Sequence, residues 1–261
     1  VFMDSPETTH IEARRLSLDS TPGEPIRELT LARPKKRNAL PVETIRSFTR
    51  LLESIVPGDG SAVVIRAQGE DFCLGADITS LDPESLEDPA AVARVVQNLV
   101  MSLRECPLPV VAGVQGRVYG LGVHICLGAD LVVAEEGTSF AVPEADLGLP
   151  VAGFVTSLLP QLIGERRARH WLFTGADIGT EAAAEAGFVT MSATEAAFEE
   201  TLHGLLSQLD ASSSAALAAL KSQLASLEHP GRDQAAAVEQ AAMRSAYEEG
   251  DAVDRIGRLL N

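Results

Sequence analysis

Hydrophobic residues recur along the first half of the chain in two alternating patterns. The segments Pro41–Val56 and Pro89–Glu105 carry apolar residues at helical spacing. Between and after them, Ala62–Ala67, Pro109–Val114 and Asp130–Ala134 are short, almost unbroken apolar runs, which are typical of strands covered on both faces. Helices that alternate with strands of this kind predict an α/β layer built on a buried sheet.

The two ends of the chain follow different patterns. Near the beginning, Ile11–Leu18 and Ile26–Leu31 alternate in polarity on either side of the turn-rich Thr21–Pro25, which predicts a β-hairpin. From Leu158 onward nearly every segment has helical spacing. Its alanine-rich composition suits helices packed on one another or on another subunit. The helices that we expect there are Ser157–Ile163, Glu165–Phe173, Thr180–Ala186, Thr194–Leu209, Ser212–Leu227 and Arg232–Leu260.

One central stretch gathers the residues best suited to chemistry. Gly120-Leu121-Gly122 opens an apolar helix, whose first backbone N–H groups lack intrahelical partners and lie at the positive end of the helix dipole. Such a helix start favours a developing negative charge. His124 falls on the helix face of the Leu121 amide, and Glu144 follows the extended piece Ser139–Val142. The sequence therefore predicts two acid–base groups, His124 and Glu144, on either side of one anion site.

Composition narrows the classes of function. With 261 residues and 46% hydrophobic content, the chain supports one sizeable core. A net charge of −16 repels nucleic acid and anionic membranes, and the basic cluster Lys35-Lys36-Arg37 is better sized for a small phosphorylated ligand. Three widely spaced cysteines argue against a disulfide framework or a zinc site, and no apolar run is long enough to span a membrane. We therefore expect a cytoplasmic protein without a metal, a nucleic-acid partner or a membrane partner.

Five sequence blocks, in order along the chain, carry a resemblance to a known family. The blocks are Arg33-Pro34 with Asn38-Ala39-Leu40; Phe72-Cys73-Leu74-Gly75-Ala76-Asp77; Gly116 and Gly120-Leu121-Gly122 with Cys126-Leu127-Gly128-Ala129-Asp130; Pro143-Glu144 with Leu147-Gly148-Leu149; and Leu162-Ile163-Gly164 with Leu172-Phe173-Thr174-Gly175. These blocks are distributed along the chain, which resembles the crotonase, or enoyl-CoA hydratase/isomerase, superfamily over nearly its whole length.

The resemblance implies both a fold and a binding site. The fold would be α/β, a crotonase-like spiral of ββα repeats over residues 1–200, with a C-terminal helical region over residues 201–261 that builds a homotrimer or a dimer of trimers. The substrate would be an acyl-CoA thioester, so that coenzyme A enters as part of the substrate and no separate cofactor is needed. Its carbonyl oxygen would lie between the amides of Ala76 and Leu121. The implied substrate-binding residues are Lys36, Arg37, Ala39, Leu74, Ala76, Asp77, Gly120 and Leu121.

The reaction at such a thioester depends on which side chains move protons. Family hydratases usually carry two glutamates; in this chain Glu144 stands at the second position and His124 at the first. We expect Glu144 to be the principal acid/base, His124 to be its partner, and the reaction to be hydration of a 2-enoyl-CoA. Two alternatives stay open, a double-bond isomerase that uses Glu144 alone and a non-catalytic acyl-CoA-binding protein. For His124, a hydrogen-bonded core histidine is an equally open interpretation.

One segment departs from the family pattern near the expected acyl pocket. The usual Pro-Gly-x-Gly-Gly appears here as Val151-Ala152-Gly153-Phe154. This change removes glycine freedom and adds a bulky ring where the acyl tail usually runs. We therefore expect an unusual acyl pocket.

Overall fold

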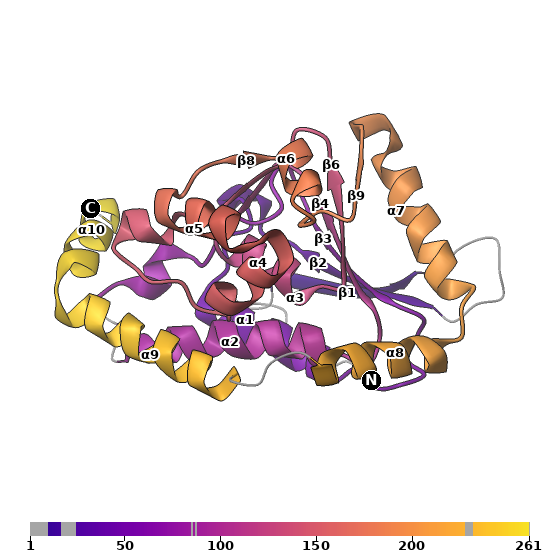
Figure 1. Ribbon diagram of the computed structural model, residues 1–261, viewed down its shortest axis with the longest axis horizontal. Coiled ribbons are helices and arrows are strands. Elements are labelled where there is room, and N and C mark those ends of the chain that lie inside the picture. Colours follow the sequence, from indigo (N-terminus) through magenta and orange to yellow (C-terminus); the bar gives the residue numbers. More distant parts are fainter. Residues whose placement is uncertain (1–9, 17–24, 85, 87, 228–231, 261) are drawn as a thin grey trace.

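A mostly parallel sheet lies at the centre of the fold (Figure 1). The computed structural model describes residues 10–16, 25–84, 86, 88–227 and 232–260, and six strands of this part pair in the order β1-β2-β3-β4-β6-β9. The β1–β2 pair is antiparallel and the other pairs are parallel. The strands are β1 (Ile11–Leu16), β2 (Ile26–Leu31), β3 (Val63–Ala67), β4 (Val110–Val114), β6 (Leu131–Glu135) and β9 (Met191–Ala193).

Helices cover both faces of this sheet, which explains the unbroken apolar runs of its strands. In β3, Val63 and Ile65 belong to one core cluster and Val64 belongs to another. The larger cluster includes residues of α1 (Val42–Glu53), α2 (Pro89–Glu105) and α3 (Leu121–Gly128), and the smaller one residues of α7 (Glu195–Asp210). In Figure 1, α7 stands on the other side of the strands from α1, α2 and α3. The predicted α/β layer with a buried sheet is confirmed.

A smaller sheet brings two distant segments to the same place. Strand β5 (Arg117–Tyr119) runs parallel to β7 (Ser139–Ala141), which pairs antiparallel with β8 (Ile178–Gly179). Strand β5 leads into α3, and β7 leads into the 3-10 helix η3 (Pro143–Leu147). Because β5 and β7 are parallel neighbours, the starts of α3 and η3 lie side by side.

The C-terminal helices fold back over the core (Figure 1). Helix α9 (Arg232–Glu248) packs along α2, and α10 (Asp251–Leu260) packs on η2 (Ile78–Leu81) and η3. Helix α8 is anchored by Lys221, whose Nζ donates to the carbonyls of Leu103 and Leu108 at 3.0 Å and to Asp130 Oδ2 at 2.7 Å. The remaining helices are η1 (Pro34–Lys36), α4 (Val155–Ile163), α5 (Glu165–Thr174), α6 (Thr180–Glu185) and α8 (Ser214–Leu227).

Two predictions at the ends of the chain have different outcomes. The hairpin is confirmed by the antiparallel register of β1 and β2, while residues 17, 18 and 21–24 of the prediction lie outside the described residues. The single helix expected over Arg232–Leu260 is wrong, because α9 ends at Glu248 and α10 begins at Asp251. Between them Gly250 has φ 87°, a left-handed conformation that ends a helix and favours glycine. The expected boundary at residue 200 falls inside α7, and the division into two regions stays a prediction.

Candidate active site

The first turn of α3 presents a backbone amide because of the conformation of Gly120. This residue precedes the helix with φ 49° and ψ −112°, which glycine adopts readily and which strains any residue that has a Cβ atom. Gly120 donates its own N–H to the Ala141 carbonyl at 3.0 Å. The next amide, that of Leu121, donates to no other residue in the described part of the chain. It stands at the positive end of the helix.

A second amide, that of Ala76, comes from a loop that lies against this helix start. A Cβ atom built on Gly75 would lie 3.9 Å from the Leu121 nitrogen, and one built on Gly120 would lie 3.5 Å from the Gly75 Cα. Like Leu121, Ala76 donates its N–H to no other described residue. Two neighbouring segments therefore each carry an amide without an acceptor among the described residues, and their joint role at one oxygen stays a prediction.

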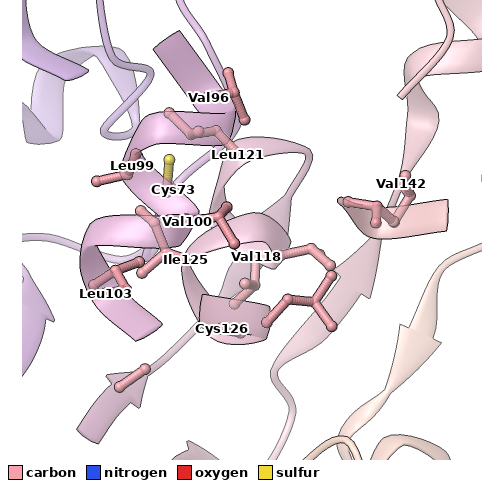
Figure 2. Packing of buried hydrophobic residues seen from close by; sticks show 14 of the residues in the cluster. Cys73, Val96, Leu99, Val100, Leu103, Val118, Leu121, Ile125, Cys126 and Val142 are labelled. Carbon is pink, nitrogen blue, oxygen red and sulfur yellow. The ribbon is translucent and has the colours of Figure 1, made fainter. Parts of the chain in front are cut away.

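Packing fixes the helix and the loop relative to each other. Figure 2 shows Leu121 and Ile125 of α3 beside Val100 of α2, in a cluster where each is almost fully buried. On the loop side, a Cβ atom at Gly122 would come within 2.7 Å of the Cys73 carbonyl oxygen. Only glycine permits this close approach, so the sequence Gly120-Leu121-Gly122 determines both the free amide and its distance from the loop.

Glu144 reaches this place from η3. A Cβ atom on Gly120 would lie 3.0 Å from Glu144 Oε1, so the carboxyl group lies directly against the helix start. Its side chain is 17% exposed, and Oε2 has no hydrogen-bond partner among the described residues. Burial raises the pKa of the Glu144 carboxyl to about 7, because an ionised carboxylate loses hydration in this position.

His124, near the start of α3, lies beside Glu144 of η3. Its Nε2 is 3.6 Å from Glu144 Oε1, which is longer than a hydrogen bond. Neither ring nitrogen has a hydrogen-bond partner in the described part of the protein. Burial lowers the pKa of His124 to about 4, so the imidazole is neutral near pH 7. Whether His124 is the partner of Glu144 or a core histidine therefore stays open.

Together these groups suit proton transfer next to an enolate. A carboxyl group whose pKa is near 7 has both of its protonation states populated at neutral pH, which favours general acid–base catalysis. A neutral imidazole beside it has one nitrogen that donates and one that accepts hydrogen bonds. A backbone amide without an acceptor is the kind of donor that stabilises an oxygen as it gains negative charge.

The predicted coenzyme A contacts lie in two adjoining loops. Leu40 donates its N–H to the Gly75 carbonyl at 3.0 Å, and Leu74 donates to the Arg37 carbonyl at 3.2 Å. These bonds join the segment that contains Ala39 to the segment that contains Ala76. The exposed basic side chains at the edge of the pair are those of Lys35, Lys36 and Arg37.

Asp77 supports this arrangement through its side chain. Its carboxylate accepts from Arg33 Nη1 at 2.5 Å and from the Thr79 hydroxyl at 2.8 Å. Arg33 Nη1 also donates to the Ala39 carbonyl at 2.6 Å. The ion pair thus ties the loop of Ala39 to the turn after Ala76. The substrate contact expected of Asp77 stays a prediction, and its carboxylate is engaged by the protein itself.

Two features near the site were not predicted from the sequence: the backbone conformation of Phe154 and the buried carboxylate of Glu239. Phe154 lies immediately before α4 in a left-handed conformation, with φ 62° and ψ 17°, and Glu239 Oε2 accepts its N–H at 3.1 Å. The available signal for Glu239 was its spacing of four residues from Ala235 and Met243 in α9, which puts an acidic residue on the apolar face of that helix.

The described residues contain no group of three or more His, Cys, Asp or Glu side chains placed to hold a metal ion. None of the helices in this part of the chain has the length and hydrophobicity to cross a bilayer.

Comparison with known proteins relates the chain to one family. The family described as enoyl-CoA hydratase/isomerase matches residues 22–254. A Rhodobacter capsulatus protein named "probable enoyl-CoA hydratase" is 31% identical over 193 residues, which are 74% of this chain and 75% of that protein. The human "enoyl-CoA hydratase domain-containing protein 3, mitochondrial" is 30% identical, and the match covers 67% of this chain and 58% of that protein.

The crystal structure of an enoyl-CoA hydratase from Mycobacterium avium subsp. paratuberculosis has a TM-score of 0.85 at 24% identity, covering 97% of this chain and 99% of that one. The crotonase-like fold is confirmed.

The raised pKa of Glu144 predicts a pH-dependent effect of Glu144→Gln on stability. In the folded protein the pKa is about 7, against an ordinary value of 4.5, so the folded state binds more protons between these values. Its free energy of unfolding therefore falls as pH rises through that window. Glutamine cannot ionise, so the variant should be more stable than the wild type by at most about 3 kcal/mol near pH 8, and the gain should be small near pH 5.

Urea denaturation of both proteins at the two pH values measures this difference. Glu181→Gln, at an exposed position in α6, is the matched control and should show no such pH dependence. An equal stability difference at both pH values would contradict the assigned burial of the Glu144 charge.

Proposed function

The chain belongs to the enoyl-CoA hydratase/isomerase family, and from this premise we propose that it adds water to a 2-enoyl-CoA thioester. The observation that carries the proposal is the pair formed by Glu144 and His124. The carboxyl group has a pKa of about 7 and lies 3.6 Å from a neutral imidazole. The carboxyl group lies against the start of α3, where the Leu121 amide and, in the neighbouring loop, the Ala76 amide have no acceptor among the described residues.

In this proposal the two amides bind the thioester oxygen. As water attacks C3 of the enoyl group, one water proton passes to the Glu144 carboxylate and the hydroxyl group bonds to C3. The electrons of the double bond move onto the thioester oxygen and give an enolate, which the Ala76 and Leu121 amides stabilise by about 3 kcal/mol for each donor. Glu144 then returns the proton to C2, and the enolate collapses to the 3-hydroxyacyl thioester. Neutral His124 orients the attacking water through Nε2.

The low pKa of His124 favours one alternative in particular. An imidazole with a pKa of about 4 is a weak base near neutral pH. In double-bond isomerisation of a 3-enoyl-CoA, Glu144 alone can carry the proton between the α and γ carbons. This reaction does not require His124 to accept or donate a proton. Isomerisation is therefore the second candidate function.

Kinetics of two variants separate the two reactions. His124→Ala should lower kcat/KM for hydration of a 2-enoyl-CoA by about 10²- to 10⁴-fold, because the attacking water loses a positioned partner. Isomerisation of a 3-enoyl-CoA by Glu144 alone should be largely preserved. Glu144→Gln should damage both reactions. In the wild type, kcat/KM for hydration should rise with pH through about 7, because the carboxylate form accepts the proton.

His170→Ala, at an exposed position in α5, is the control for loss of a histidine and should behave as the wild type does. Wild-type rates in Glu144→Gln would contradict both proposed reactions. Tight acyl-CoA binding without turnover by the wild type would instead support a non-catalytic acyl-CoA-binding protein.

A second prediction concerns the amide of Leu121. Gly120→Ala places a Cβ atom 3.0 Å from Glu144 Oε1 at a residue whose φ is 49°. The helix start should shift, and kcat should fall by about 10²- to 10³-fold, the usual effect of losing one donor to the oxyanion. Gly137→Ala is the matched control, since Gly137 also has a positive φ but its Cβ would meet nothing within 4 Å. Equal loss of turnover in the two variants would point to general strain and away from the oxyanion role.

We further propose that the active form is a homotrimer or a dimer of trimers. Support comes from Leu162 of α4 and from Leu220 and Leu224 of α8, which are large apolar side chains exposed to solvent. They line one groove of about 580 Å³, and apolar surface of this kind is characteristic of subunit interfaces. Sedimentation should give a trimer or hexamer for the wild type and smaller species for Leu220→Lys combined with Leu224→Lys. A monomeric wild type would overturn this assembly.

A further inference from the structure

A buried carboxylate on α9 lies near the candidate site and takes no part in the proton transfers proposed above. Glu239 is 3% exposed. Its Oε2 accepts hydrogen bonds from Gln97 Nε2 at 2.7 Å and from the Phe154 amide at 3.1 Å, and its Oε1 accepts one from Thr156 Oγ1 at 3.4 Å. All three donors are neutral. Because burying a carboxyl group among neutral partners is costly, Glu239 is a candidate for a role other than fold stability.

The donor from α2 is itself held by α9. Gln240 donates its Nε2 to Gln97 Oε1 at 2.8 Å, and Gln97 Nε2 also donates to the Ala236 carbonyl at 3.2 Å. Figure 1 shows α9 running along α2, with α4 close by. Glu239 therefore belongs to a network of hydrogen bonds that joins α2 to α9, and from this network one oxygen reaches the residue before α4.

The residue that Glu239 reaches has an unusual backbone. Gly153 and Phe154 both have left-handed conformations, with φ 68° and φ 62°, and a bulky residue keeps such a conformation only where its surroundings hold it. The Phe154 carbonyl accepts from the amides of Ser157 and Leu158 in α4 at 3.0 and 2.8 Å. Its N–H is bonded to Glu239. Helix α4 thus holds the carbonyl side, and the carboxylate holds the peptide between Gly153 and Phe154.

This peptide lies against one side of the His124 ring. A Cβ atom built on Gly153 would lie 3.5 Å from His124 Nδ1, 2.9 Å from Val96 Cγ1 and 3.2 Å from Val100 Cγ2. Both ring nitrogens are buried and have no hydrogen-bond partner among the described residues, so packing orients the ring. The Gly153 backbone packs beside Nδ1, while Nε2 is the nitrogen that lies 3.6 Å from Glu144 Oε1.

We propose that Glu239 is a positioning residue for His124: through the Phe154 amide it holds the Gly153 backbone against Nδ1, and it thereby keeps water from the ring and Nε2 beside Glu144. When the acceptor is lost, the peptide between Gly153 and Phe154 turns and water reaches Nδ1. The effect on turnover rests on the hydration proposed above, whereas the effect on the ring does not.

Nuclear magnetic resonance of ¹⁵N-labelled histidine tests the effect on the ring. His124→Ala identifies the His124 signal by its loss. Burial lowers the pKa of His124 from 6.5 to about 4, so the wild-type ring should stay neutral at about pH 5.5 and above. In Glu239→Leu, which has no acceptor for the Phe154 N–H, hydration should raise this pKa to about 5 or above. Loss of a nearby carboxylate by itself would lower the pKa, so a rise reports water at the ring.

Glu239→Gln is the matched control, because it removes the charge and keeps the acceptor. Its amide oxygen can take the place of Oε2 and accept the Phe154 N–H, and its NH₂ group can donate to the Thr156 hydroxyl. The pKa of His124 should therefore stay as in the wild type. Glu248→Leu repeats the loss of a carboxyl group at an exposed position of α9 and should also leave it unchanged.

A double-mutant cycle with His124→Ala measures the effect on turnover. Glu239→Leu should lower kcat/KM for hydration of a 2-enoyl-CoA by about 10- to 10²-fold, because the ring is displaced. In the His124→Ala background the same substitution should cost less than about twofold, since the ring through which Glu239 acts is absent. A purely structural role would give equal losses in both backgrounds.

A folded Glu239→Leu protein in which the pKa of His124 matches that in Glu239→Gln would overturn the proposal, and so would equal losses in both backgrounds. If Glu239→Leu fails to fold, Glu239→Asp replaces it, because the shorter side chain withdraws the carboxylate from the Phe154 amide, and the same rise in pKa is expected. Wild-type protein without hydratase activity refutes the proposed function and leaves the resonance comparison as the test of Glu239. Normal wild-type turnover with an unchanged ring in Glu239→Leu refutes the role of Glu239 alone.

Discussion

The missing side chain at Gly120 is the constraint on which the rest of the site depends. With φ 49° and ψ −112°, this residue turns the chain from β5 into α3 and leaves the Leu121 amide free of intrahelical bonding. The space that a Cβ atom would need lies against Glu144 Oε1 and Gly75. One backbone conformation therefore brings together an amide, a carboxyl group and a loop from three separate parts of the chain.

Burial acts on the two titratable groups of the site in opposite directions. It raises the pKa of Glu144 and lowers that of His124, and in both cases the uncharged form is favoured. A protein with a net charge of −16 thus has a candidate site in which burial disfavours charge. Positively charged side chains suited to phosphate groups lie outside this site, at the exposed residues Lys35, Lys36 and Arg37.

Much of this arrangement could be predicted from local sequence, and the remainder depends on contacts across the chain. Apolar spacing predicted α1, α2 and the central strands, and Gly120-Leu121-Gly122 predicted the helix start, because these signals lie within a few residues. The distance between His124 and Glu144 depends on the pairing of β5 with β7, which no local pattern specifies. Helical spacing continues through the alanine-rich segment Arg232–Leu260, so the break at Gly250 was not predicted. A short strand such as β9 has too few residues to give a periodic signal.

The contacts of Glu239 also determine the order in which the site is completed during synthesis. Gln97 precedes Glu239 by 142 residues in the chain, and a nascent protein acquires its structure from the N-terminal side onward. The sheet, the two amides and both acid–base side chains have emerged before α9 is made. Until then the carboxylate that accepts the Phe154 N–H is missing. The groups of the candidate site are therefore synthesised before Glu239, which holds the backbone next to them.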